Sequence, residues 1–114
     1  MIIVRREDLA LSVADAVLAV PGVAALHPGF GVEVATLFSG GKVVGVRLSG
    51  ETVQVYLTAD RVPLQPVAQG AAAAAGRVLA AAGDPRPVEI VVADVTTAAL
   101  TRRTTTRGTV GAHG

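Results

Sequence analysis

The sequence predicts an α+β domain: a small sheet of three to four strands with two helices packed on it, in the order helix, strand, strand, strand, helix, strand. Two apolar stretches have helical spacing, at residues 9–20 and 64–82, and the segments between and after them are rich in β-branched residues. A chain of 114 residues is long enough for one hydrophobic core and too short for two. We therefore expect a single domain over residues 1–95 and a flexible tail rich in Thr, Arg and Gly over residues 96–114.

The first helix is predicted from apolar residues that recur at steps of three and four. Asp8 is a candidate N-cap, and Ser12 is an alternative start for the helix. Pro21 and Gly22 are expected to end it, because proline cannot continue the backbone hydrogen bonds and glycine accepts a left-handed exit. Residues 23–31 are predicted to form a loop punctuated by glycine and proline.

Three strands are expected next, over residues 32–38, 42–48 and 52–58. The last two flank the tight connection Ser49-Gly50-Glu51 and are predicted to form a hairpin. Apolar and polar residues alternate in the second of them, so one face should be buried and the other wetter. A final strand over residues 88–95 carries an apolar run at its centre that is typical of a buried strand.

The second helix is predicted over residues 64–82, where apolar positions again step by three and four. Two glycines lie inside it, each costing roughly 1 kcal/mol of helix stability relative to alanine. Together with the run of alanines between them they make a flat surface that can approach a sheet or a second subunit closely. We expect an interaction surface on this helix, formed by Gly70, Ala73, Ala74, Gly76 and Arg77.

The charge distribution argues against a nucleic-acid-binding domain. The formal net charge is +1, but residues 96–114 contain three arginines and no acidic residue, so residues 1–95 carry a net charge of −2. Nucleic-acid-binding domains normally carry a basic face on the folded part. The aromatic residues are Phe30, Phe38 and Tyr56 alone, which leaves little surface for stacking on bases or sugars. We expect neither a nucleic-acid partner nor a small-molecule substrate.

A catalytic or metal site finds little support in the sequence. There is no cysteine, which excludes disulfides and thiolate zinc sites and fits a reducing cytoplasm. His27 has no partner at helical spacing, and Glu33 lies six residues away across two glycines. Gly40-Gly41-Lys42 lacks the full pattern of a phosphate-binding loop and is followed by a strand, so a plain turn is expected. A buried carboxylate pair among Glu33, Asp60 and Asp94 stays open without a sequence reason to expect it, and we expect no catalytic residue, cofactor or metal.

The apolar run near the N-terminus is preceded by Arg5 and Arg6, as in a signal peptide. Glu7 and Asp8 cancel these two charges, and Asp15 interrupts the run. Its 12 residues are also fewer than the roughly 20 that a membrane span needs. We therefore expect a soluble, cytoplasmic protein.

Five segments, in their order along the chain, carry a resemblance to a known family. They are VPGVAALHPG at 20–29, EVATLF at 33–38, VVGVRLSGETVQVYLTA at 43–59, VPLQPVAQGAAAAAGRVL at 62–79 and RPVEIVVADV at 86–95. With these, residues 9–95 resemble the alkaline shock protein family, also called the Gls-type envelope stress response proteins, in its actinobacterial form. The resemblance implies a small cytoplasmic α+β protein without known catalytic activity, linked to cell-envelope stress and to self-association. It supplies no established catalytic or ligand residues to carry over.

The resemblance leads us to expect a non-enzymatic stress response protein that forms homo-oligomers and docks to a membrane-anchored or cytoplasmic protein. Some family members associate with the inner face of the membrane through such a partner, so we expect the same peripheral location here. Two alternatives stay open. One is a small RNA-binding α+β module similar to a KH domain, although no GxxG loop between helices is visible. The other is a small enzyme that uses His27 and a nearby carboxylate.

Overall fold

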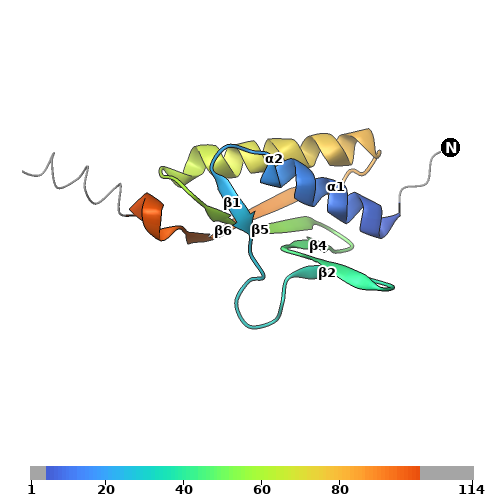
Figure 1. The fold of residues 1–114 in the computed structure, drawn as a ribbon. Coiled ribbons are helices and arrows are strands. Elements are labelled where there is room, and N and C mark those ends of the chain that lie inside the picture. The colour runs from blue at the N-terminus through green and yellow to red at the C-terminus, as the bar shows by residue number, and fades with distance from the viewer. Residues whose placement is uncertain (1–4, 101–114) are drawn as a thin grey trace, which may run out of the picture.

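The computed structural model describes residues 5–100 as two helices packed on one face of a mixed sheet, with a small hairpin beside the sheet (Figure 1). The elements are α1 (Arg6–Leu18), β1 (Val23–Leu26), β2 (Ala35–Phe38), β3 (Gly41–Val44), β4 (Val46–Leu48), β5 (Val53–Ala59), α2 (Leu64–Ala81) and β6 (Val88–Val95). One further helical turn covers residues 97–100. The predicted α+β class is confirmed, but the two long helices enclose five strands where three were expected.

Strand β5 is the centre of the four-stranded sheet. β6 pairs with it in parallel along one edge, with Val55 opposite Ile90. Two short strands share the other edge: β4 pairs antiparallel with the first half of β5, and β1 pairs antiparallel with the second half. β2 and β3 form a separate antiparallel hairpin that lies next to β4. All three of the other strands in the main sheet therefore pair with β5.

Strand β1 lies where the sequence predicted a loop. Its four residues, Val-Ala-Ala-Leu, do not alternate between apolar and polar and include a single β-branched side chain. Nothing local therefore marks this segment as a strand. Its partner is remote in the chain, with Leu26 opposite Leu57, and this tertiary pairing overrides the weak local preference.

The strand predicted over residues 42–48 is divided at Gly45, between β3 and β4. Gly45 has a φ of +88°, a left-handed conformation that other residues rarely adopt. Its N–H donates to the Val34 carbonyl (2.8 Å), and its carbonyl accepts from the Tyr56 N–H (2.8 Å). The Tyr56 carbonyl in turn accepts from the His27 N–H (2.8 Å). Tyr56 is thus the residue of β5 at which β1 ends and β4 begins.

Helix α1 begins at Arg6, earlier than the sequence predicted. Arg5 occupies the N-cap position without a side-chain cap, while Glu7 and Asp8 lie in the first turn, where negative charge suits the helix dipole. The predictions that Asp8 or Ser12 starts the helix are therefore wrong. The physical reason is that the Arg6 side chain anchors this turn by hydrogen bonds to carbonyls of two strands.

The hydrophobic core fills the space between the helices and one face of the sheet. It includes Val53, Val55, Leu57 and Ala59 of β5 together with Val67, Ala71, Ala75 and Leu79 of α2. The four side chains of β5 have no exposed surface. Each buried Val or Leu contributes roughly 1.5–3 kcal/mol by leaving water, so the burial of these side chains is a major source of stability. The alternation predicted for β5 and the stripe predicted for α2 are both found.

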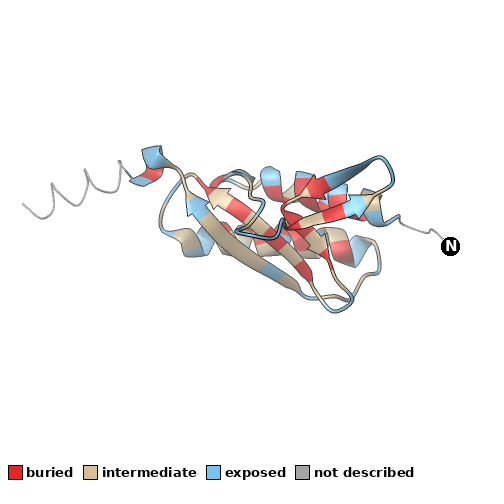
Figure 2. Ribbon diagram, turned by 90° about the horizontal axis from the view of Figure 1, so that it is seen from below, coloured by how far each residue is buried: buried red, intermediate tan, exposed pale blue. Residues whose placement is uncertain are grey.

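The opposite face of the sheet carries no helix within residues 5–100 (Figure 2). Tyr56 and Thr58 of β5 and Val91 of β6 are half-buried residues on this open face. No residue of β6 is fully buried, although its apolar run predicted a buried strand. The reason is its position, because β6 has a paired neighbour on one edge and a helical cover on one face.

The domain extends past the predicted boundary at residue 95. The Thr96 N–H donates to the Ala59 carbonyl (2.9 Å), and Ala99 is buried within the helical turn that follows. Residues 96–100 therefore belong to the domain and not to the predicted tail. The rest of that predicted tail, residues 101–114, lies outside the described part of the chain.

Gly45→Ala tests the crowding at the junction of β1 and β4. A Cβ at this position would lie 2.7 Å from Leu26 Cβ and 3.2 Å from the His27 nitrogen, with the φ held at +88°. We expect the free energy of unfolding to fall by about 3–5 kcal/mol, because backbone strain and overpacking add. Urea unfolding measures the loss.

Gly40→Ala is the matched control for this substitution. Its φ is +93°, but an added Cβ meets nothing within 4 Å. Only the backbone strain remains, so the loss should be about 1–2 kcal/mol. Equal losses for the two variants would contradict the crowded junction.

Candidate functional site

His27, the candidate catalytic histidine, lies at the start of the loop that joins β1 to β2. Its Nδ1 accepts a hydrogen bond from the Gly29 N–H (2.9 Å), and its ring packs at a tilt against Phe30 with the ring centroids 5.0 Å apart. The Val34 N–H closes the loop by donating to the Pro28 carbonyl (2.8 Å). One ring nitrogen of His27 is therefore used to shape its own loop.

The three carboxylates considered as catalytic partners are each engaged elsewhere. Glu33 Oε1 accepts from the Lys42 Nζ (2.7 Å), and Asp94 Oδ1 accepts from the backbone N–H of the next residue (2.8 Å). Asp60 Oδ1 accepts from Arg61 Nε (3.0 Å). Within residues 5–100 no group of three or more His, Cys, Asp or Glu could hold a metal ion. The structure thus gives these carboxylates partners other than His27.

The segment Gly40-Gly41-Lys42 forms the turn between β2 and β3. Gly40 has a φ of +93°, and Gly41 lies opposite Phe38 at the first pair of the hairpin. The segment continues into β3, whereas a phosphate-binding loop continues into a helix whose N–H groups face the anion. The prediction of a plain turn is confirmed.

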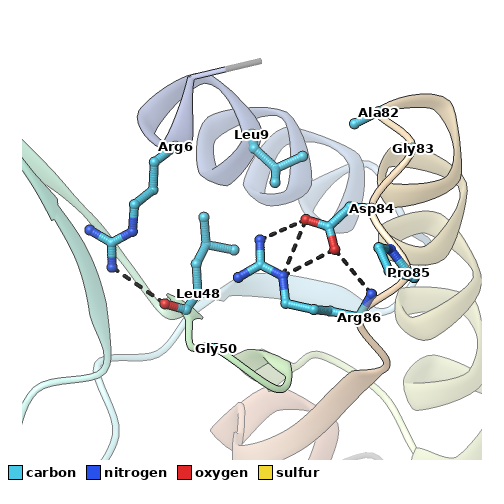
Figure 3. Close-up of a pocket in the computed structure, with 9 residues that line it drawn as sticks. All are labelled: Arg6, Leu9, Leu48, Gly50, Ala82, Gly83, Asp84, Pro85 and Arg86. Atoms are coloured by element: carbon cyan, nitrogen blue, oxygen red, sulfur yellow. Dashed lines mark hydrogen bonds and ion pairs between the residues drawn. The ribbon is translucent and has the colours of Figure 1, made fainter. Parts of the chain in front are cut away.

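A polar cleft of about 580 Å³ lies between the start of α1, the turn from β4 to β5 and the connection from α2 to β6 (Figure 3). Its lining consists of Arg6, Leu9, Leu48, Gly50, Ala82, Gly83, Asp84, Pro85 and Arg86. The sequence did not mark these residues as a site. A local signal does exist in Asp84-Pro85, because an aspartate in a short connection often accepts a backbone N–H two residues on.

Arg86 and Asp84 form the main polar contact of the cleft, which we call the Arg86–Asp84 bridge. Arg86 Nη2 lies 2.6 Å from Asp84 Oδ2, Nε donates to Oδ1 (3.0 Å), and Nη1 donates to the Ser49 carbonyl (2.6 Å). These side-chain hydrogen bonds hold the pKa of Asp84 below its usual value, against the opposing effect of partial burial. The bridge therefore ties the connection from α2 to β6 onto the turn from β4 to β5.

Arg6 lines the same cleft but points away from the Arg86–Asp84 bridge (Figure 3). Its Nη1 donates to the Leu37 carbonyl (3.0 Å) and its Nη2 to the Leu48 carbonyl (3.3 Å), which ties α1 to β2 and β4. Both arginines of the cleft thus donate to acceptors within the protein. The charged side chains that line this cleft therefore connect secondary-structure elements.

The structure separates the five residues of the interaction surface predicted on α2, Gly70, Ala73, Ala74, Gly76 and Arg77. Ala73 and Arg77 are exposed, and Gly76 is half-buried. Ala74 is buried and cannot reach a partner. Gly70 packs against the exit of α1, where an added Cβ would lie 2.9 Å from Val20 Cγ1. Ala73, Gly76 and Arg77 are therefore the members of the predicted surface that are accessible and do not lie against the exit of α1.

Other exposed apolar side chains lie away from this helix. Phe30 and Val32, in the loop between β1 and β2, are 74% and 81% exposed, and Leu37 of β2 is 64% exposed. The half-buried apolar residues of β6 form a second accessible surface at the edge of the sheet. Exposed apolar surface of this kind often marks a contact site.

Comparisons with protein-family models, with curated proteins and with solved structures gave no match to this chain. The resemblance to the alkaline shock protein family therefore stays a prediction that rests on the order of its sequence segments. Among the described residues, no helix is both long enough and apolar enough to cross a membrane.

His27→Ala and His27→Asn test the structural role of this side chain. An asparagine oxygen can accept from the backbone N–H two residues on, as Nδ1 of His27 does from Gly29, whereas alanine cannot. We expect His27→Ala to lower the free energy of unfolding by about 1 kcal/mol, and His27→Asn to lower it by less. Urea unfolding measures both, and an alanine variant as stable as the wild type would rule out this role.

Asp84→Asn should cost stability in a pH-dependent way. The pKa of Asp84 is depressed below its ordinary value of 3.8 in the folded protein. The charged bridge therefore contributes fully above that value, and its contribution is lost as the pH falls through the lower pKa of the folded state. We expect the wild type to be more stable than Asp84→Asn by about 1–2 kcal/mol near neutral pH. The difference should shrink in acid.

Urea unfolding across the acidic range measures this difference. Glu33→Gln is the control, because Glu33 forms an exposed pair with Lys42, and such pairs contribute about 0.5 kcal/mol or less. A difference between the wild type and Asp84→Asn that stays constant on acidification would show that the charge of Asp84 is not what stabilises the bridge.

Proposed function

We propose that the protein is a non-enzymatic envelope stress response protein that works by self-association and by docking to a membrane-anchored or cytoplasmic protein. The observation that carries this proposal is the uncovered side of the sheet. Within residues 5–100 the helices cover one face. No helix covers the opposite face, where Gly29 of the β1–β2 loop lies near the Tyr56 ring, and the outer edge of β6 stays unpaired. Open faces and free edges of this kind are commonly completed by another chain.

The polar side chains considered above make structural hydrogen bonds, which supports a non-enzymatic role. His27 shapes its own loop, and Arg6, Asp84 and Arg86 join secondary-structure elements. In the described part of the chain, no buried side-chain nitrogen or oxygen lacks a hydrogen-bond partner. Strongly perturbed titratable groups often mark functional sites. Here the shifted pKa of Asp84 has a structural cause, its hydrogen bonds with Arg86.

The surface around the exposed loop favours a protein partner over RNA. Phosphate binding needs basic side chains that can reach outward. Lys42 instead pairs with Glu33 (2.7 Å), and Arg47 Nη2 donates to the Glu33 carbonyl (3.2 Å). Phe30 and Val32 beside them offer apolar surface, which suits a protein contact better than a phosphate backbone.

We place this function in the cytoplasm, at the inner face of the membrane, with a membrane-anchored partner providing the attachment. This location comes from the resemblance of residues 9–95 to the alkaline shock protein family. The membrane contact is then indirect, and the protein surface has to recognise the partner and not lipid.

Light scattering after gel filtration of the full chain tests self-association, and co-purification with the membrane fraction of cells tests docking. We expect multimers that grow in population with concentration, and release from the membrane fraction when membrane proteins are digested. The RNA-binding alternative instead predicts binding to a short RNA that weakens steeply as salt rises. A chain that stays monomeric at every concentration and never sediments with membranes would exclude the proposal.

A further inference from the structure

We infer that the free edge of β6 is the self-association surface, where two copies pair antiparallel about a twofold axis at Ile90 to form one continuous sheet. This inference rests on the proposed function and names the surface that carries it. β6 pairs with β5 along one edge, and none of the described residues pairs with its other edge. An accessible strand edge is a template for another chain.

The pairing with β5 decides which backbone groups of β6 are free. Val53 lies opposite Val88, and its N–H donates to the Pro87 carbonyl (2.9 Å). In a parallel ladder every second residue directs both its N–H and its C=O to the same neighbour, so the odd-numbered residues of this segment face β5. The N–H and C=O groups that face the free edge belong to Val88, Ile90 and Val92.

The segment from Val88 to Val92 lacks the features that usually protect an edge strand. It contains no proline and no lysine, and Glu89 is its single charge. Its register with β5 is regular as far as Val92, and the shift in register comes only after Leu57 of β5. None of its residues is buried. The segment thus combines accessible backbone groups with apolar side chains.

A second copy fits this edge best in the register centred on Ile90. Ile90 then lies opposite itself and Val88 opposite Val92, so all the outward residues of the segment exchange both of their hydrogen bonds. Glu89 lies opposite Val91 of the second copy. A register shifted by one residue would set Val91, on the open face, opposite Val92, on the helical face. It would therefore turn the helical layers of the two copies to opposite faces.

The helix above β6 leaves room for the second copy. α1 covers β1 and β4, and α2 covers β6. At 100° per residue, Ala68, Ala72 and Gly76 lie on the side of α2 opposite to Gly70 and Val78, which border α1. A Cβ at Gly76 would meet nothing within 4 Å. Small residues on this flank allow the α2 helices of two copies to lie side by side over the continuous sheet.

Val91→Glu tests the inferred register. The new carboxylate would face Glu89 of the second copy at two symmetric places, so we expect the dimer dissociation constant to rise roughly tenfold or more. Val91→Lys places an opposite charge against Glu89 and should keep the dimer. The double variant Glu89→Lys with Val91→Glu should restore it, because the opposite charges then face each other again. Sedimentation velocity on the full chain measures association, and circular dichroism verifies folding.

Gly76→Phe tests the same interface from the helical layer. A phenylalanine fits the open space in one copy but would collide with α2 of the second, so the dissociation constant should again rise at least roughly tenfold. Ala73→Phe is the matched control, since Ala73 is exposed on the outer side of the same helix. It should leave association unchanged.

The outcomes separate this inference from the proposed function. If the wild type self-associates and a folded Val91→Glu variant associates equally well, the edge inference is wrong while self-association stands. If the wild type is monomeric at every concentration, the edge inference and the self-association part of the proposed function are both wrong, while docking is decided by co-purification with membranes. Hydrogen exchange identifies the remaining case: amides of Ile90 and Val92 that stay protected in a monomer would mean that the same chain covers this edge, which overturns the inference.

Discussion

The fold depends on β5 being paired along both edges while its inner face is buried in the core formed with both helices. The parallel partner β6 runs the full length of one edge, whereas the other edge is divided between β4 and β1 at Tyr56. This division places three backbone segments around one residue, and the space left at Gly45 admits no side chain. The remaining elements are arranged around that constraint: the β2–β3 hairpin leaves the sheet before Gly45, and α1 covers the two short strands.

The periodicity of the sequence predicted β5 and α2, because their own residue patterns decide which side chains are buried. The alternating residues of β5 and the steps of three and four in α2 indicate which side chains are buried, whatever the rest of the chain does. The periodicity did not predict the strand β1 or the start of α1, which are decided by remote partners. β1 becomes a strand because Leu26 meets Leu57, and α1 starts at Arg6 because its guanidinium reaches Leu37. An apolar run likewise indicates hydrophobicity and not position, so the prediction of a buried strand is wrong for β6, which lies at the edge of the sheet.

In the candidate sites, too, the sequence indicates some of the features set by nearby residues and none of those set by remote partners. The chain around His27 predicts no catalytic companion for it, and it gives no sign of the hydrogen bond of His27 with Gly29. The Arg86–Asp84 bridge includes a local interaction, in which Asp84 accepts from the Arg86 N–H, and a remote one, in which Arg86 donates to the Ser49 carbonyl. The sequence around Asp84 indicates only the local interaction. On α2, small residues allow close packing on any side of the helix. Composition alone therefore cannot distinguish Gly70, which packs inward, from Gly76, which faces open space.

The junction at Tyr56 has a further consequence for how this fold can diversify. The chain leaves the sheet at His27 and returns at Gly45, and the backbone groups of both bond to the same residue of β5. The excursion between them, with its exposed loop and hairpin, therefore begins and ends at one point of a rigid scaffold. Lengthening a segment whose ends are already joined costs little chain entropy, about 0.6 kcal/mol for each doubling. The exposed residues 30–33 can thus vary and form new recognition surfaces without a change in the register of the sheet, whereas Val34, Thr36 and Val43 of the same segment are buried.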